Sequence, residues 1–480
     1  MKKNFSINSI NKFFYNLSKN DCIDQLIANE SLNIVKGHPQ YLNIFKLKTF
    51  FEYFIIFIKY VLLLINKIIF SFFFFNSKLY KKKIKSELLI VSHLIKFPLN
   101  INNLNKDLYF SEFEKNKAFK KKKKFKIFIN HTSYFKQGFR DEKKIILQNY
   151  TSFISSIIIF NKLFLQFLKF FISSFFIKKG SSANLRIIAL EFLSPKTFNN
   201  LIFKNNLKLL IKEAEINKVF FTFEGFGWER FLCEIIKKNN NNTKIIAYQF
   251  AALLKQQNSM FQKIHSKYLP HVILTVGKIN YKILKKKFSK VIILGSSRRF
   301  PIKRKFSNYK NKKNLNCLVL PEGIDTECIN LINFTIKCAK ENPRIKFIIR
   351  FHPFTNTKKL LFSIKFLDSI KDLKNVVISK KSLLSDIKNS SICFYRGSTS
   401  VITAVQCGVF PFYIDFEDKL NIDPMYKINH LIFYLRTFKD FNLKINESVR
   451  LNIMKKIRKF AQDYFLEFNQ HRLTKIINSR

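Results

Sequence analysis

Cysteine pairs are missing from this sequence. It has seven cysteines, an odd number, and no two of them are separated by only two residues. A zinc finger needs such closely spaced pairs, and most of these cysteines lie in apolar runs. The pattern favours reduced, buried thiols in a cytoplasmic protein. The residues are Cys22, Cys233, Cys317, Cys328, Cys338, Cys393 and Cys407.

Acidic residues are also scarce, because 31 Asp and Glu stand against 86 Lys and Arg, which gives a formal net charge of +55. Such an excess suggests nucleic acid or an anionic membrane as a partner. The lysines are spread along the chain, however, and accompany 58 Phe but only 10 Gly and 10 Pro. We interpret most of these lysines as solvated surface residues, some of which attract a membrane surface. Nucleic acid is the less favoured partner.

No uncharged apolar run reaches the ~18–20 residues of a membrane span. Two segments come close, at 50–75 and 152–176. Glu52, Lys59 and Asn66 recur every seven residues in the first, and Ser155, Lys162 and Lys169 do so in the second. Each segment is therefore predicted to be a helix that is apolar nearly all round, with one polar stripe. Such a helix is buried in the protein, lies in a membrane interface or, less favoured, spans the membrane. The amino terminus has no pattern typical of a signal peptide.

Short apolar runs alternate with helical stretches after residue 85, which predicts two doubly wound α/β domains. The expected organisation is a helical region at 1–85 that is either membrane-associated or buried, a first α/β domain at 86–299, a linker at 300–314, a second α/β domain at 315–446 and a C-terminal helix at 447–480. Strands are expected in the first domain at 87–95, 126–130, 185–190, 218–225, 244–250, 271–277 and 290–297. The second domain is expected to have strands at 315–323, 345–353, 375–380, 391–400 and 409–415, with helices near 325–341, 357–371 and 401–407.

The strand expected at 345–353 ends in Arg350 and His352, followed by Pro353. Strand side chains alternate, so residues two apart point to one face, and the proline ends the strand. An arginine and a histidine presented together suit a phosphate group. The alternative is an arginine in a salt bridge and a histidine that caps a turn.

A second polar strand end follows in the segment "YRGSTSV". Gly397 allows close approach of the backbone, Arg396 adds charge, and Ser398, Thr399 and Ser400 precede a predicted helix. This composition favours an anion site over a plain helix cap, although no P-loop motif is present.

Acidic residues end two further strands. Glu322 and Gly323 follow the strand at 315–323, where a carboxylate binds a sugar hydroxyl or caps the helix. Glu224 ends the strand at 218–225, and we interpret it as a general base with Glu229 as its supporting partner or, less favoured, as the base itself. Pairing of Glu229 with a lysine is the structural alternative.

Arg298 follows the last strand of the first domain and is expected to reach a donor phosphate. No DxD motif occurs, and Asp415 to Glu417 is the nearest approach, so we expect no metal and no cofactor. The isolated His93, His131, His265 and His271 are interpreted as structural.

The ordered set "EGFGWE", "AYQF", "LPHVILTVG", "LGSSR", "LPEG", "RFHP" and "RGSTSV" resembles bacterial surface-carbohydrate biosynthesis proteins of the O-antigen and capsule type, which have the GT-B fold. The HP and serine motifs are similar to those of sialyltransferases and Kdo transferases. The resemblance covers about residues 86–475. It implies that Glu224 and Glu229 form the acidic pair, that His352 belongs to the HP motif, and that Ser398 and Ser400 form the serine motif. Phe250 stands where the family would have histidine.

The resemblance implies a metal-independent glycosyltransferase that takes a nucleotide-activated sugar, of the CMP type, and a glycan or lipid-linked glycan acceptor. It would be cytoplasmic, and peripheral contact with the anionic inner face of the cell membrane would fit its basic, apolar helices. A CDP-glycerol or polyol-phosphate transferase of the teichoic-acid type is one alternative. The other is a basic protein without enzymatic activity that binds membrane or nucleic acid.

Overall fold

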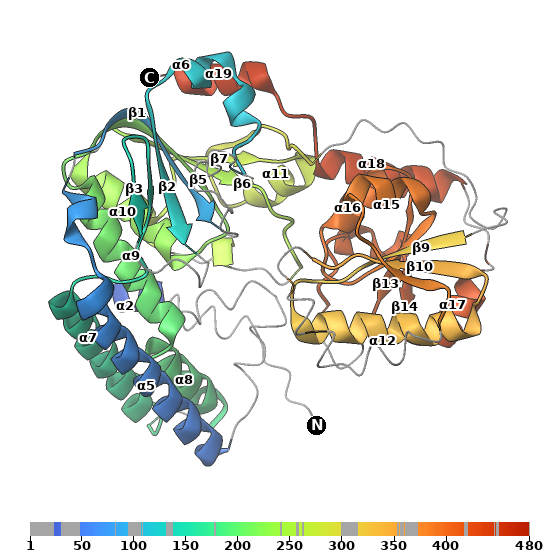
Figure 1. The fold of residues 1–480 in the computed structure, drawn as a ribbon, viewed down its shortest axis with the longest axis horizontal. Coiled ribbons are helices and arrows are strands. Elements are labelled where there is room, and N and C mark those ends of the chain that lie inside the picture. The colour runs from blue at the N-terminus through green and yellow to red at the C-terminus, as the bar shows by residue number, and fades with distance from the viewer. Residues whose placement is uncertain are drawn as a thin grey trace.

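The computed structural model of the 480-residue chain has two α/β domains side by side, with a helical region attached to the first (Figure 1). It describes residues 24–29, 49–81, 83–94, 107, 109–130, 138–176, 179–240, 242–255, 259–261, 264–298, 315–352, 355, 360, 373–416, 421–445, 447 and 451–479. The expected linker at 300–314, Pro353, His131 and all but one residue of the helix expected near 357–371 lie outside these residues.

The first domain is built on an eight-stranded sheet in the order β3-β4-β2-β1-β5-β6-β7-β8. All neighbours are parallel except β3 and β4. The strands are β1 (Lys85–Leu94), β2 (Lys124–Asn130), β3 (Phe139–Arg140), β4 (Lys144–Ile146), β5 (Glu215–Thr222), β6 (Lys244–Gln249), β7 (Val272–Thr275) and β8 (Val291–Ile293).

Both faces of this sheet are buried, which is why its strands are continuous apolar runs in the sequence. Leu88 and Ile90 belong to one core, whereas Leu89 and Val91 belong to the core on the opposite face. The helices of this domain are α6 (Lys117–Lys121), α8 (Lys179–Phe192), α9 (Pro195–Ile211), α10 (Gly227–Asn239) and α11 (Lys278–Leu284).

The strand expected at 185–190 is wrong, because these residues lie within helix α8. Leu185 and every residue from Ile187 to Leu190 are buried. A helix that is buried nearly all round has no 3.6-residue pattern, so its short apolar run looks like that of a buried strand. The other expected strands of the first domain are confirmed as β1, β2 and β5 to β8, while β3 and β4 were not foreseen.

The second domain has a six-stranded parallel sheet in the order β11-β10-β9-β12-β13-β14. Its strands are β9 (Leu315–Leu320), β10 (Ile345–Ile349), β11 (Val376–Ile378), β12 (Ile392–Tyr395), β13 (Phe410–Ile414) and β14 (Phe433–Leu435). Its helices within the described residues are α12 (Asp325–Glu341), α15 (Leu383–Asn389), α16 (Ser400–Gln406) and α17 (Phe438–Lys444). The five expected strands are confirmed, as is the helix expected at 325–341.

The C-terminal stretch is two helices, α18 (Leu451–Tyr464) and α19 (Gln470–Asn478), where one was expected. Helix α18 packs on α16 of the second domain and on α11 of the first, and α19 lies beside α6 (Figure 1). The segment between them is fixed to the end of β8, because the Ser296 N–H donates to the Leu466 carbonyl and the Asn469 N–H donates to the Leu294 carbonyl. The end of the chain therefore ties the two domains together.

The apolar segments of the sequence form α5 (Phe50–Phe74) and α7 (Phe153–Ser173), which lie with α8 at the lower left of Figure 1. Both are long and apolar enough to cross a membrane, and most of each is not buried within the protein. A five-residue helix, α2 (Asp24–Ala28), packs on α9 and α10. Short 3-10 turns cover Ser77–Tyr80, Phe113–Lys115, Ser259–Phe261, Ser266–Tyr268 and Tyr426–Leu431. The predicted architecture, two doubly wound α/β domains with an apolar helical region, is confirmed.

Candidate functional site

Each sheet has one position where the chain reverses its direction of winding. In the first sheet it lies between β1 and β5, and in the second between β9 and β12. The loops at the carboxyl ends of such strands form a crevice, which is where α/β proteins bind ligands. Glu224 follows β5, Glu322 and Gly323 follow β9, and the segment 396–400 follows β12. Most of the residues selected from the sequence therefore lie at these two reversal points.

Glu229 is fully buried and holds the loop that carries Glu224. Its carboxylate accepts hydrogen bonds from the backbone N–H groups of Glu224 (3.0 Å), Gly225 (2.7 Å) and Phe226 (2.8 Å). Glu224 itself is half-buried. Glu229 therefore supports the backbone of this loop, and Glu224 is the more exposed carboxylate of the pair.

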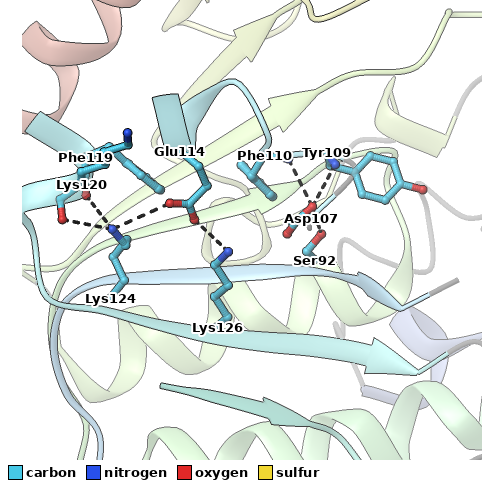
Figure 2. A network of polar contacts seen from close by, with 9 residues as sticks. All are labelled: Ser92, Asp107, Tyr109, Phe110, Glu114, Phe119, Lys120, Lys124 and Lys126. Atoms are coloured by element: carbon cyan, nitrogen blue, oxygen red, sulfur yellow. Dashed lines mark hydrogen bonds and ion pairs between the residues drawn. The ribbon is translucent and has the colours of Figure 1, made fainter. Parts of the chain in front are cut away.

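Tyr109 lies within electrostatic range of Glu224, although no motif in the sequence pointed to it. Burial, and next the Glu224 carboxylate, raise the pKa of the Tyr109 phenol, while Arg298 acts in the opposite direction. Its backbone is fixed by Asp107, which accepts from the Tyr109 N–H (2.8 Å) and from the hydroxyl of Ser92 on β1 (3.0 Å; Figure 2). The ring packs on Phe250, with centroids 4.4 Å apart. Phe250, which stands where the resemblance implied a histidine, is thus a packing partner of Tyr109.

His93 lies near the carboxyl end of β1, at the reversal point of the first sheet. Its Nε2 is 2.8 Å from the Thr222 hydroxyl, and its ring meets the rings of Tyr109 and Trp228 edge to face. These contacts agree with the structural role predicted for His93. The criterion that selected Glu224, a polar residue at the carboxyl end of a strand, would also have selected His93.

Arg298 joins the two domains. Its Nη1 donates to the Thr399 hydroxyl in the second domain at 3.1 Å, and its guanidinium lies over the Phe465 ring. Burial lowers the pKa of Arg298, and Tyr109, Tyr248 and Glu224 oppose this shift. The arginine therefore brings a positive charge to the point where the carboxyl edges of the two sheets meet.

Two close contacts between loops define the second-domain side of the site. A Cβ atom at Gly323 would lie 2.9 Å from Nδ1 of His352, and one at Gly397 would overlap the Glu322 carboxylate. The loops that follow β9, β10 and β12 are thus in direct contact. Gly397 makes room for a side chain of the protein itself, which the sequence did not indicate.

His352 is half-buried between charged groups of both signs. Burial lowers the pKa of its imidazole, Glu322 raises it and Arg298 lowers it. The net direction is downward, which favours the neutral form of the imidazole. A neutral imidazole donates one hydrogen bond and does not carry a positive charge.

The two other arginines selected from the sequence are paired within the protein. Arg350 Nη1 lies 2.9 Å from the Asp386 carboxylate, which matches the salt-bridge alternative. Arg396 is fully buried, where its Nε pairs with Glu327 and its Nη1 donates to a backbone carbonyl. Both arginines therefore form ion pairs within the second domain.

The hydroxyl residues after β12 surround the start of α16. Ser398 is buried, and Thr399 and Ser400 are half-buried. Thr399 is the N-cap residue, but its side chain makes no capping hydrogen bond, and its hydroxyl accepts from Arg298 instead. The plain helix cap is therefore not the role of Thr399.

A cavity of about 590 Å³ lies at the opposite edge of the first sheet, around the amino ends of β1 and β2 and the β3–β4 turn. Its cationic lining is Lys83, Lys85, Lys120, Lys122, Lys123, Lys124, Arg140 and Lys143, and its acidic lining is Asp141 and Glu142. Figure 2 shows how Glu114 pairs with Lys124 and Lys126 beside it. This cavity is separate from the site described above.

No known family model and no curated protein matches this chain. Among solved structures, TarM from S. aureus, in a complex containing UDP, is 12% identical over 58% of this chain and 59% of its own, with a TM-score of 0.35. MurG from Acinetobacter baumannii is 9% identical over 58% of this chain and 80% of its own, with a TM-score of 0.39. UDP-GlcNAc 2-epimerase from Methanocaldococcus jannaschii is 11% identical over 79% of this chain and 99% of its own, with a TM-score of 0.42. Similarity this low leaves the function to be inferred from the residues of the chain itself.

Proposed function

We propose that this protein is a metal-independent glycosyltransferase with the GT-B architecture. It moves a sugar from a nucleotide-activated donor, with the CMP type favoured, to a surface polysaccharide of the O-antigen or capsule kind or to its lipid-linked precursor. The observation that carries the proposal is Arg298, which links the first-domain side with Glu224 to the second-domain side with His352 and Thr399. Arg298 thus connects the loops at the reversal point of one sheet to those of the other. This arrangement suits a donor and an acceptor that meet between two domains.

The second-domain side is proposed to bind the donor. The Arg298 guanidinium contacts the loop that carries Ser398, Thr399 and Ser400, and the neutral His352 imidazole adds a hydrogen-bond donor. When the bond between the anomeric carbon and the phosphate oxygen breaks, its electron pair stays on that oxygen. Arg298 and His352 would stabilise this charge.

The first-domain side is proposed to bind the acceptor. Glu224 takes the proton of the acceptor hydroxyl while that oxygen forms the new bond to the anomeric carbon. Glu229 fixes the loop, and the rings of Tyr109 and Phe250 form an apolar wall beside it. Such walls suit the apolar faces of sugar rings.

The proposed class of acceptor also predicts where in the cell the enzyme works. A lipid-linked glycan is met at a membrane surface, so we propose a cytoplasmic enzyme in peripheral contact with an anionic membrane.

One observation favours the alternative of a basic binding protein without enzymatic activity, namely the lysine-lined cavity at the far edge of the first sheet. Anion binding there would be lost gradually with salt.

A donor screen tests the proposed activity. Calorimetry with CMP-, CDP-, UDP- and GDP-linked donors is expected to give one preferred nucleotide, and transfer is then measured with that donor. His352→Ala should weaken donor binding, while Glu224→Gln should keep binding and lose transfer. The matched controls are the exposed His430→Ala and Glu213→Gln.

Three results would contradict the proposal or shift it. Donor binding and turnover by His352→Ala equal to those of His430→Ala would overturn the glycosyltransferase assignment. A preference for CDP-glycerol, with transfer of the polyol phosphate, would replace it with the teichoic-acid type of reaction. Salt-dependent binding to nucleic acid that exceeds every nucleotide-sugar would favour the non-enzymatic alternative.

A further inference from the structure

Exposed apolar side chains are concentrated on the pair of helices formed by α5 and α7. Nineteen of the twenty-two large apolar side chains that are exposed among the described residues lie within 50–74 or 153–176. Apolar patches of this size on one part of a protein mark a contact surface. In Figure 1 the two helices lie side by side, away from the second domain.

The exposed side chains of α5 follow helical spacing. They recur every three or four residues and so form one stripe along the outside of a helix that is ~37 Å long. The stripe consists of Phe51, Phe54, Ile55, Ile58, Leu62, Ile65, Ile69, Phe72 and Phe73. Helix α7 and the two residues beyond its C-cap have the same kind of stripe, made of Ile154, Ile157, Ile158, Leu165, Leu168, Ile172, Phe175 and Phe176. These seventeen side chains are called the outer stripes below.

The inner faces fix the two helices as an antiparallel pair. Phe57 stacks on Phe167 at one level, and the Ser156 hydroxyl donates to the Ser71 hydroxyl (3.0 Å) at another. The rings of Phe72 and Phe153, both exposed, meet edge to face with centroids 5.9 Å apart. The outer stripe of α5 therefore meets α7 on its exposed side, and the two stripes form one surface.

Lysines border this surface on both helices. Lys59 on α5 and Lys162 and Lys169 on α7 are exposed and lie one helical step to the side of the outer stripes. The acidic residue of α5, Glu52, is engaged in the N-terminal capping box with Thr49. An apolar face with a cationic border matches the interface of a bilayer with anionic headgroups.

We propose that the outer stripes of α5 and α7 lie in the interface of an anionic lipid bilayer, with both helices parallel to the membrane plane. The proposal deepens the proposed function, on which it rests, because it names the surface where the enzyme meets a lipid-linked acceptor.

A membrane span is disfavoured by the inner contacts, since Lys67 pairs with Asn199 of α9 and the Tyr60 hydroxyl donates to Glu191 of α8 at 3.2 Å. A span would break these contacts and place five charged residues in hydrocarbon.

Vesicle sedimentation with the full chain tests this. Binding to phosphatidylcholine vesicles that contain phosphatidylglycerol should exceed binding to pure phosphatidylcholine vesicles. The variant Ile58→Ser, Leu62→Ser, Ile65→Ser should bind the former at least about tenfold more weakly. The matched control changes three exposed apolar residues elsewhere, Leu209→Ser, Val377→Ser, Leu443→Ser, and should bind like the wild type.

The cationic border is tested separately. Replacement of Lys59, Lys162 and Lys169 by Gln should weaken binding to the anionic vesicles and leave the weak binding to neutral vesicles unchanged. Its control replaces three exposed second-domain lysines by Gln and should behave like the wild type. These are Lys337, Lys346 and Lys388.

Several outcomes would overturn the proposal. One is equal loss of vesicle binding in the stripe variant and its control. Another is a lipid-free dimer that only the stripe variant disrupts, because a second copy would then cover the stripes. Retention on vesicles after alkaline carbonate extraction would indicate a span. Failure of this proposal is distinguishable from failure of the proposed enzyme, because the stripe variant should still transfer sugar to a soluble acceptor and His352→Ala should still bind vesicles.

Discussion

Replacing Glu229 with glutamine keeps the size of the side chain and removes its charge. In the native protein the carboxylate is fully buried and accepts from three successive backbone N–H groups, those of Glu224, Gly225 and Phe226. A glutamine oxygen in the position of Oε2 can still accept these bonds, but as a neutral group. Hydrogen bonds to a charged acceptor are about twice as strong as those to a neutral one.

The magnitude follows from these contacts. If each of the three bonds loses about 1 kcal/mol, the free energy of unfolding falls by about 3 kcal/mol. The amide NH₂ would also take the place of Oε1, which lies 3.1 Å from the Glu224 N–H, so a donor would face a donor. We expect Glu229→Gln to lower the free energy of unfolding by about 2–4 kcal/mol in urea denaturation.

Turnover should fall together with stability, because the same loop carries Glu224. The comparison is Glu224→Gln, which changes a half-buried side chain and should alter the free energy of unfolding by less than about 1 kcal/mol while it abolishes transfer. If Glu229→Gln kept its stability and lost only transfer, Glu229 would itself be the base. Unchanged stability together with unchanged transfer would refute the supporting role.

Three further changes test the second domain. Gly397→Ala should displace Glu322 and lower donor affinity in calorimetry with little loss of secondary structure, because the added Cβ overlaps the carboxylate. Arg396→Met leaves Glu327 buried without its partner and should cost about 3–5 kcal/mol in urea unfolding. Burial raises the pKa of Asp423 to about 6 from 3.8, so the folded state binds this proton more tightly and stability falls as pH rises from about 4 through 6. Asp423→Asn should remove that part of the pH dependence of unfolding.

The sequence predicted the sheets well because their strands are buried on both faces. Strands β1 and β5 appear as continuous apolar runs, and the polar residues that follow them mark the carboxyl edge. Helix α8 was mistaken for a strand because its middle is also buried all round. Strand β3 has only two residues, too few to show a pattern in the sequence.

The site was predictable in position but not in the pairing of its side chains. Glu224 and His352 were selected because they end strands. Glu224 lies at the reversal point of the first sheet, whereas His352 follows β10, which neighbours β9 at the reversal point of the second. The partner that Arg350 finds depends on Asp386, which is 36 residues away along the chain and beside it in space. Tyr109 reaches the site because Asp107 fixes its loop to β1. Tyr109 does not follow a strand, so the strand-end pattern could not select it.

The position of Arg298 connects the site to the angle between the domains. The backbone around this residue is fixed by Ser296, whose hydroxyl accepts from the Arg298 N–H and whose own N–H donates to the carbonyl of Leu466 in the C-terminal segment. The guanidinium lies over the ring of Phe465 in that same segment and donates to Thr399 across the domains. A rotation of one domain against the other must therefore move the guanidinium relative to Thr399 or break a contact of the C-terminal segment. It follows that a ligand bound to Arg298 and the second-domain loops together would favour one angle between the domains, and that the segment between α18 and α19 helps to position Arg298.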